Sequence, residues 1–140
     1  MHELALVMIK PDAFERHLDE TIRASLTQEG LEIIFRKNLQ LDECLIRAYQ
    51  PVLDEPSEFG EDWKKEVMVA LTKRAVEILI VKGQDALLRV RLLKKRLRSI
   101  YCPGEDYHDR VIFNLLHTTD DQGELERNMG LLAPEAKHLS

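Results

Sequence analysis

Asn114-Leu115-Leu116-His117-Thr118-Thr119-Asp120-Asp121 is the stretch around which the rest of the chain is organised. Residues 111–116 form a short apolar run, which is typical of a buried strand. Downstream, hydroxyl and acidic residues precede Glu124, and such residues cap the positive end of a helix. The pattern predicts a strand over 111–116 and a helix that starts after Asp121. His117 is therefore expected at their junction, where an imidazole is either held rigidly against a ligand or merely ends the strand.

Composition limits the class of protein. The chain has 140 residues, of which 44% are hydrophobic and 32% charged, and its net charge is -5. These values are typical of a soluble globular protein with one domain over residues 1–140. The negative charge does not favour a nucleic-acid partner, and no apolar run approaches the roughly 20 residues of a membrane span. No signal peptide is recognisable and Cys44 and Cys102 form no C-x-x-C pair, so we expect a cytoplasmic protein without a metal-ligand motif.

Hydrophobic periodicity predicts three further strands, over residues 4–9, 31–41 and 75–81. Helices are expected over 18–26, from a cap at Asp42, over 63–71 and over 85–97, with Gly30 ending the first of them. Loops are expected over 51–62 and 101–109. This order is compatible with an α+β fold: a ferredoxin-like βαββαβ antiparallel sheet with helices covering one face.

Two segments resemble the nucleoside diphosphate kinase family. ALVMIKPDAFER, residues 5–16, resembles the family's first strand and loop, where an IKPD signature supplies an active-site lysine. NLLHTTDD, residues 114–121, resembles its phosphohistidine motif N-x-x-H-G-S-D, and GQDALLRVRLL, residues 83–93, resembles its helix with a phosphate-binding arginine. The motifs occur in the family's order and spacing, and the resemblance covers nearly the full length. It is weakest over 51–74 and 94–110.

The resemblance implies an enzyme that transfers the γ-phosphoryl group from a nucleoside triphosphate to a nucleoside diphosphate. The reaction would be ping-pong, through phosphohistidine at His117. Lys10 would place a positive charge near the transferred group, and Arg91 and Arg98 would bind phosphate oxygens. Mg²⁺ would be bound through the nucleotide phosphates rather than by a protein carboxylate cage.

Further roles follow from the same resemblance. Tyr49 would lie close to the histidine, Asn114 would contact the sugar, and Trp63 and Val67 would hold the base. The implied partners are nucleoside tri- and diphosphates and further copies of the chain in a dimer-based homo-oligomer. Several of these residues also have an ordinary interpretation: a lysine at a strand end, arginines on an exposed helix face, and packed aromatic rings.

Departures from the family pattern leave a second function open. Thr118 replaces a glycine beside the histidine, whereas Thr119 keeps the hydroxyl of the family's serine and supports the site. Asn128 stands where the family has a glutamate that orients the imidazole, and an amide offers no charge to an imidazolium. The family's G-x-T-N-P segment is replaced by Lys94-Lys95-Arg96, which are candidates for replacement contacts. The alternatives are a catalytically impaired nucleotide-binding or regulatory module and an unrelated ferredoxin-like protein.

Overall fold

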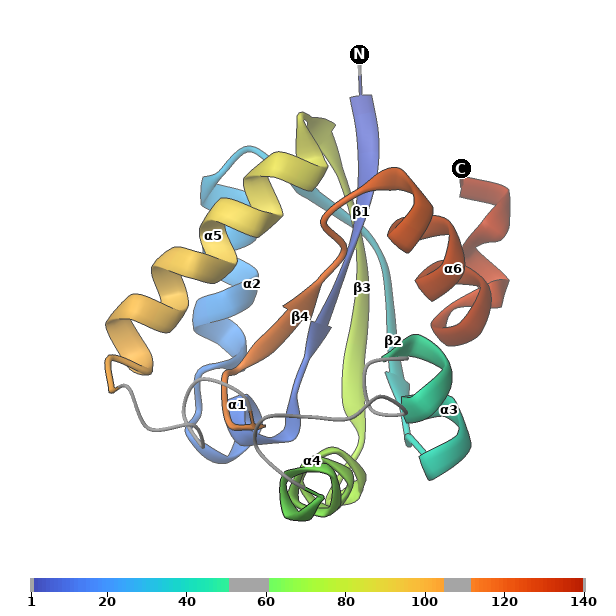
Figure 1. Cartoon of the computed structure of the whole chain (residues 1–140). Helices are drawn as coiled ribbons and strands as arrows, with labels where there is room; N and C mark the ends of the chain where they lie inside the picture. Colours follow the sequence, from blue (N-terminus) through green and yellow to red (C-terminus); the bar gives the residue numbers. More distant parts are fainter. Residues whose placement is uncertain (1, 51–60, 105–111, 140) are drawn as a thin grey trace.

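Strand β1 (His2–Ile9) lies at the centre of the sheet. The structure, a computed structural model, describes residues 2–50, 61–104 and 112–139. β1 pairs along its whole length with antiparallel β3 (Val76–Gln84) and over three residues with antiparallel β4 (Leu116–Thr118). β2 (Glu32–Leu39) pairs with the far side of β3, so the strand order is β2-β3-β1-β4 (Figure 1). This order confirms the predicted ferredoxin-like antiparallel sheet.

Helices cover both faces of this sheet, and the expectation that they cover one face was wrong. α2 (Asp19–Gln28) and α5 (Ala86–Tyr101) pack on the face that carries Ala5 and Val7. The opposite face, which carries Leu6 and Met8, is covered by α3 (Glu43–Tyr49), α4 (Asp62–Thr72) and α6 (Gln122–Leu132) (Figure 1). Both faces need cover because the last five residues of β1 are all apolar and all buried, as in a strand enclosed on two sides.

The signals predicted for the start and end of two helices are present in the structure. The Asp42 carboxylate accepts the Leu45 N–H at 2.8 Å, which confirms the predicted cap. Gly30, just beyond α2, has φ +81°, a conformation in which a side chain is strained. A short helix α1 (Pro11–Glu15) and a terminal 3₁₀ helix η3 (Pro134–Leu139) were not predicted.

β4 differs most from the prediction. The strand expected over 111–116 instead runs from Leu116 to Thr118 and so contains His117, rather than ending before it. The strand does not extend back through Leu115, because the backbone of that residue adopts a left-handed conformation, with φ 73°. Residue 111, residues 51–60 of the loop predicted over 51–62, and part of the loop predicted over 101–109 lie outside the described residues. Within the described ranges, no helix is long and apolar enough to cross a membrane.

Candidate active site

His117 lies in the middle of β4, directly opposite Met8 of β1. Successive residues of a strand point to opposite faces, so its ring points with Met8 toward α3 and α6. The side chain of Thr118 points to the other face, where it is 1% exposed. The β-branched residue that replaces the family's glycine therefore does not crowd the imidazole.

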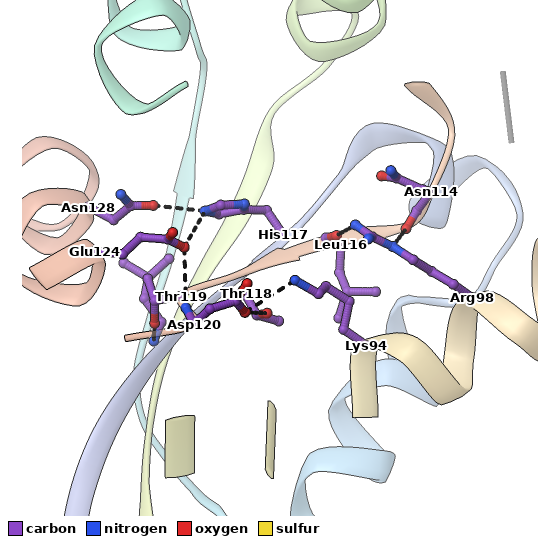
Figure 2. Close-up of polar contacts among 11 residues, drawn as sticks. Lys94, Arg98, Asn114, Leu116, His117, Thr118, Thr119, Asp120, Glu124 and Asn128 are labelled. Atoms are coloured by element: carbon purple, nitrogen blue, oxygen red, sulfur yellow. Dashed lines mark hydrogen bonds and ion pairs between the residues drawn. The ribbon is translucent and has the colours of Figure 1, made fainter. Parts of the chain in front are cut away.

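Three side chains from these helices surround the ring. The Nε2 atom of His117 lies 2.8 Å from Oδ1 of Asn128 and 3.8 Å from Oε1 of Glu124, both on α6 (Figure 2). The ring of Tyr49, on α3, meets the imidazole edge to face, with centroids 5.4 Å apart. Asn128 and Tyr49 thus occupy the neighbouring positions that the sequence resemblance predicted.

The environment keeps the imidazole neutral. Burial lowers the pKa of His117 to about 4, and the charges of Lys94 and Lys10 act in the same direction. The Asn128 hydrogen bond and the charge of Asp120 oppose this shift without cancelling it. With Oδ1 of Asn128 as acceptor, Nε2 carries the ring proton and Nδ1 keeps a lone pair. The site therefore holds a neutral nitrogen nucleophile at neutral pH.

Lys10 brings a positive charge to the same end of the sheet. It follows β1, is 6% exposed, and donates from Nζ to the Ile112 carbonyl at 2.9 Å and to Oδ1 of Asn114 at 2.6 Å. Burial lowers its pKa to about 8, while the neighbouring Asp12 carboxylate opposes the shift. The ammonium is consequently fixed in place and still charged at neutral pH.

Asp12 ties the Lys10 loop to the segment before β4. Its Oδ2 accepts the N–H of Leu115 at 3.0 Å, and the Leu115 carbonyl accepts the N–H of Lys10 at 2.9 Å. These bonds hold the left-handed turn that lets β4 begin at Leu116. Sequence reasoning did not assign this role to Asp12, although the residue belongs to the IKPD signature.

One stripe of α5 carries cations along this site. Arg91, Lys94 and Arg98 are spaced by three and four residues, which places them on the same side of a helix. Nζ of Lys94 pairs with Oδ1 of Asp120 at 3.3 Å (Figure 2), whereas Lys95 and Arg96 are exposed. Of the three basic residues that replace the family's loop, Lys94 is thus the one directed toward the site.

The two arginines of this stripe differ in their contacts. Arg98 donates from Nε to the Asn114 carbonyl at 3.0 Å and from Nη2 to the Leu116 carbonyl at 2.6 Å (Figure 2). It therefore holds the backbone on both sides of Leu115. The Nε of Arg91 is buried and has no hydrogen-bond partner among the described residues.

Trp63 and Val67, the residues expected to hold a base, are packed in the core. Trp63 and Val67 are 6% and 5% exposed and belong to the core between α4 and the sheet. A stacked base needs an open side-chain face, and in this structure neither side chain presents one. The exposed apolar side chains nearby are Val69 and Phe113, which line a groove of about 650 Å³.

Thr119 forms hydrogen bonds with the backbone of β1. Its Oγ1 accepts the N–H of Leu6 at 3.0 Å and its own N–H bonds to the Leu6 carbonyl at 3.1 Å. The retained hydroxyl thus extends the pairing of β1 beyond β4.

Glu124 was missed by sequence reasoning, although a signal was present: it lies four residues before Asn128, on the same face of a helix.

The described residues contain no cluster of three or more His, Cys, Asp or Glu side chains suited to hold a metal ion. The positive charges of Lys10 and Lys94 act on His117, and cations attract the oxygens of phosphate groups. These features define a class of protein: a ferredoxin-like sheet that carries a neutral histidine on one strand, with lysines and an arginine beside it. It is equipped to bind an anionic group next to a histidine nitrogen.

Comparison with known proteins identifies the family within this class. The family model for nucleoside diphosphate kinase matches residues 3–137. The chain therefore belongs to the nucleoside diphosphate kinase family, whose members are phosphotransferases that act on nucleotides.

Individual relatives agree with this assignment. The nucleoside diphosphate kinases of Roseiflexus castenholzii and Exiguobacterium sibiricum are each 29% identical to this chain, over 139 and 133 residues. These matches cover 95% and 92% of this chain and 90% and 93% of the relatives. A halophilic nucleoside diphosphate kinase from Halobacterium salinarum, solved in complex with CDP, matches with a TM-score of 0.74 at 28% identity. That match covers 94% of this chain and 88% of the other.

Proposed function

We propose that this protein is an active nucleoside diphosphate kinase that works through phosphohistidine at His117. The observation that carries the proposal is the state of the imidazole. Burial lowers the pKa of the ring to about 4, so the ring is neutral at neutral pH. Its Nε2 lies 2.8 Å from Oδ1 of Asn128, and a proton held on Nε2 by that acceptor leaves the lone pair on Nδ1. A nitrogen in this state attacks phosphorus without first losing a proton.

The proposed reaction has two half-reactions of the same kind. In the first, Nδ1 of His117 forms a bond to the γ-phosphorus as the bond from that phosphorus to the β-phosphate oxygen breaks. The nucleoside diphosphate leaves with the electron pair of the broken bond. In the second, a phosphate oxygen of another nucleoside diphosphate attacks the phosphorus and the N–P bond breaks, which restores the neutral ring.

Positive charge and orientation supply most of the rate enhancement in such reactions. Lys10 is proposed to face the transferred group, since its buried ammonium is fixed by two hydrogen bonds. Lys94 and Arg91 are proposed to bind phosphate oxygens from the same stripe of α5. Arg98 is already engaged with two backbone carbonyls, so its proposed contribution is through its remaining N–H groups.

Mg²⁺ fits this site as an ion carried by the nucleotide. Lys10 and Lys94, whose charges act on His117, offer ammonium groups, which hold phosphate oxygens rather than a divalent cation. When bound to the phosphates, Mg²⁺ offsets their charge and orients them. Asn114 is proposed to contact the sugar, and the half-exposed ring of Phe113 beside it offers an aromatic face to a base.

A catalytically impaired module is not favoured, because the family model covers nearly the whole chain and the compared relatives carry the enzyme's name. On composition and family resemblance, we propose that residues 1–140 act as one domain of a homo-oligomer in the cytoplasm. No nucleic-acid or membrane partner is part of the proposal.

Single-turnover labelling tests the function. Wild type and His117→Ala are mixed with γ-labelled ATP and Mg²⁺, and then chased with an unlabelled nucleoside diphosphate. The expected result is an acid-labile, alkali-stable label on wild type alone, discharged by the chase. Wild-type-like labelling of His117→Ala would exclude the histidine, and nucleotide binding without any label would favour the impaired module.

A further inference from the structure

Two side chains one turn apart on α6 face the Nε2 atom of His117. Asn128 is fully buried and accepts at 2.8 Å through Oδ1, while Glu124 lies 3.8 Å away through Oε1 (Figure 2). The Nδ2 group of Asn128 is buried and has no hydrogen-bond partner among the described residues. The amide is therefore satisfied at its oxygen and unsatisfied at its nitrogen.

This imbalance gives the ring two competing states. A side-chain amide either accepts or donates, according to which end it presents. If the Asn128 amide flips, Nδ2 gains a partner in Nε2, but only when the ring proton resides on Nδ1. Such a ring has no lone pair on Nδ1 and is not a nucleophile at that nitrogen. Asn128 alone thus does not decide which nitrogen of His117 is available.

We propose that Glu124 is the positioning residue that selects the reactive form of His117. Its carboxylate favours the tautomer with the proton on Nε2 and stabilises the positive charge that the ring gains on phosphorylation. The inference rests on the proposed function and deepens it, because it assigns to Glu124 the charge that Asn128 lacks.

The contact is electrostatic rather than a hydrogen bond, because 3.8 Å is too long for one. The side chains of His117 and Glu124 are 19% and 24% exposed, so water screens the interaction only in part. A carboxylate next to Nε2 attracts the positive end of an N–H group and repels a lone pair. Both effects place the ring proton on Nε2 and keep the oxygen of Asn128 directed at it.

The fold holds the Glu124 carboxylate where this interaction needs it. Asp121 caps α6 by accepting the N–H of Glu124 at 2.8 Å, and Oε1 of Glu124 accepts the N–H of Asp120 at 3.3 Å. The Asp120 carboxylate, the other acidic group near the ring, pairs with Lys94. Its charge is therefore offset by a cation, whereas Glu124 lies against the imidazole.

Other charged groups also act on this carboxylate. Burial raises the pKa of Glu124, and the charges of Asp120 and Asp121 add to the rise, whereas the bond from the Asp120 N–H and the charge of Lys94 oppose it. On the side of the ring, Lys94 and Lys10 disfavour the imidazolium. The Asn128 hydrogen bond and the charge of Asp120 oppose these two cations without cancelling their effect. The Glu124 carboxylate, 3.8 Å from Nε2, adds a second negative charge beside the ring.

The charge balance of the phosphoryl step explains the benefit. When Nδ1 of the neutral ring bonds to phosphorus and the nucleoside diphosphate departs, no proton moves. The ring then carries a positive charge with its proton still on Nε2, facing Glu124 and Asn128. The same charge makes the ring a better leaving group in the second half-reaction.

The first test is the rate of phosphorylation in a single turnover. Glu124→Gln keeps the side-chain shape and the acceptor for Asp120 but removes the charge, and should slow phosphorylation roughly 10- to 100-fold. Nucleotide affinity should stay within about twofold, because the lost interaction is with the ring and not with the nucleotide. Glu126→Gln, which removes an exposed carboxylate from the same helix, is the matched control and should behave as wild type.

A rescue variant separates charge from general damage to the fold. Asn128→Asp has nearly the same shape as the wild-type side chain and places an acceptor-only group at Nε2. The double variant Glu124→Gln/Asn128→Asp should be phosphorylated about tenfold faster than Glu124→Gln alone, because either position can supply the carboxylate. A double variant no faster than Glu124→Gln would overturn the role assigned to the charge.

Ring nitrogen NMR tests the inference without any phosphoryl transfer. With ¹⁵N-histidine and no nucleotide at neutral pH, wild type and Glu126→Gln should show His117 with its proton on Nε2. Glu124→Gln should show a measurable population protonated on Nδ1. An unchanged tautomer in Glu124→Gln would overturn the inference. A wild-type enzyme that is never labelled would refute the proposed function, and the tautomer measurement would still decide the role of Glu124.

Discussion

Nζ of Lys10 lies 2.6 Å from Oδ1 of Asn114, a contact that joins two motifs separated by 104 positions in the sequence. The same ammonium donates to the carbonyl of Ile112, so two of its three donors are directed at the segment before β4. The cation and the histidine strand are therefore one rigid unit. A displacement of the segment before β4 would move the positive charge as well as the imidazole.

Replacement of Lys10 should affect the rate more than the affinity. Lys10→Met keeps most of the buried stem and removes the charge, and should slow phosphoryl transfer by about 100-fold while nucleotide affinity changes by only a few-fold. Rapid-quench labelling and equilibrium binding measure the two quantities. Lys82→Met is a suitable control, since Lys82 is an exposed strand lysine paired with Leu4 near the start of β1. Equal losses of rate and affinity would instead indicate a contact made in the ground state.

The alkaline limb of the pH–rate profile should report Lys10. Its pKa is about 8 in the folded chain, below the ordinary lysine value of 10.5, so the phosphorylation rate should fall as pH rises through about 8. The folded chain binds fewer protons than the unfolded chain between these two values. The contribution of Lys10 to the free energy of unfolding should therefore increase with pH across that window. Urea unfolding of wild type and Lys10→Met at both ends of the window measures this difference, and a rate that stays flat through pH 8 would contradict the assignment.

The acid limb of the pH–rate profile should report His117. Because burial lowers its pKa from 6.5 to about 4, the ring stays neutral and the phosphorylation rate should remain flat well below pH 6.5. Between pH 6.5 and about 4 the unfolded chain binds a proton on this ring and the folded chain does not. The contribution of His117 to the free energy of unfolding is therefore complete above pH 6.5 and should fall as the pH is lowered toward 4. NMR titration of the ring and a single-turnover pH profile test this. A midpoint near 6.5 in either measurement would show that the ring is not desolvated.

Much of the site was predictable because its chemistry is local to short motifs. Lys10, Asn114 and His117 each lie in a motif whose residue types are tied to one reaction, and the caps at Asp42 and Asp121 are signalled by single residues. Periodicity likewise predicted β1, β2 and β3 and the order of the longer helices, whereas β4 begins later than predicted.

Other features depend on contacts between distant segments. The left-handed Leu115, which shortens β4, is stabilised by the Asp12 carboxylate from the other end of the chain, and no pattern within 111–116 indicates it. Trp63 resembles a stacking residue in sequence, but burial of its ring is decided by packing between α4 and the sheet. The cover on both faces of the sheet was foreseeable, since the whole of residues 5–9 is apolar.

Arg98 offers a choice between a phosphate contact and a structural contact. Its Nε and Nη2 groups bond to the carbonyls of Asn114 and Leu116, so Arg98→Met should remove both hydrogen bonds, although the Asn114 carbonyl still accepts the N–H of Leu116 at 2.9 Å. We expect the free energy of unfolding to fall by about 1–3 kcal/mol, measured by urea denaturation without nucleotide. Arg96→Met is the matched control, because Arg96 lies on the same helix, is 52% exposed and pairs with Glu29 at the surface. Its loss should cost less than about 1 kcal/mol.

The same pair of variants decides which role of Arg98 dominates. A purely phosphate-binding arginine would weaken nucleotide affinity and leave the unfolding transition of the free protein unchanged. A backbone-holding arginine lowers stability first, and it lowers the phosphorylation rate because the Asn114 and His117 segment shifts relative to Lys10. Since both hydrogen bonds flank Leu115, we expect the second pattern: lower stability and a slower rate, with nucleotide affinity changed by only a few-fold. An Arg98→Met protein as stable as Arg96→Met, but with clearly weakened nucleotide binding, would assign Arg98 to the phosphates instead.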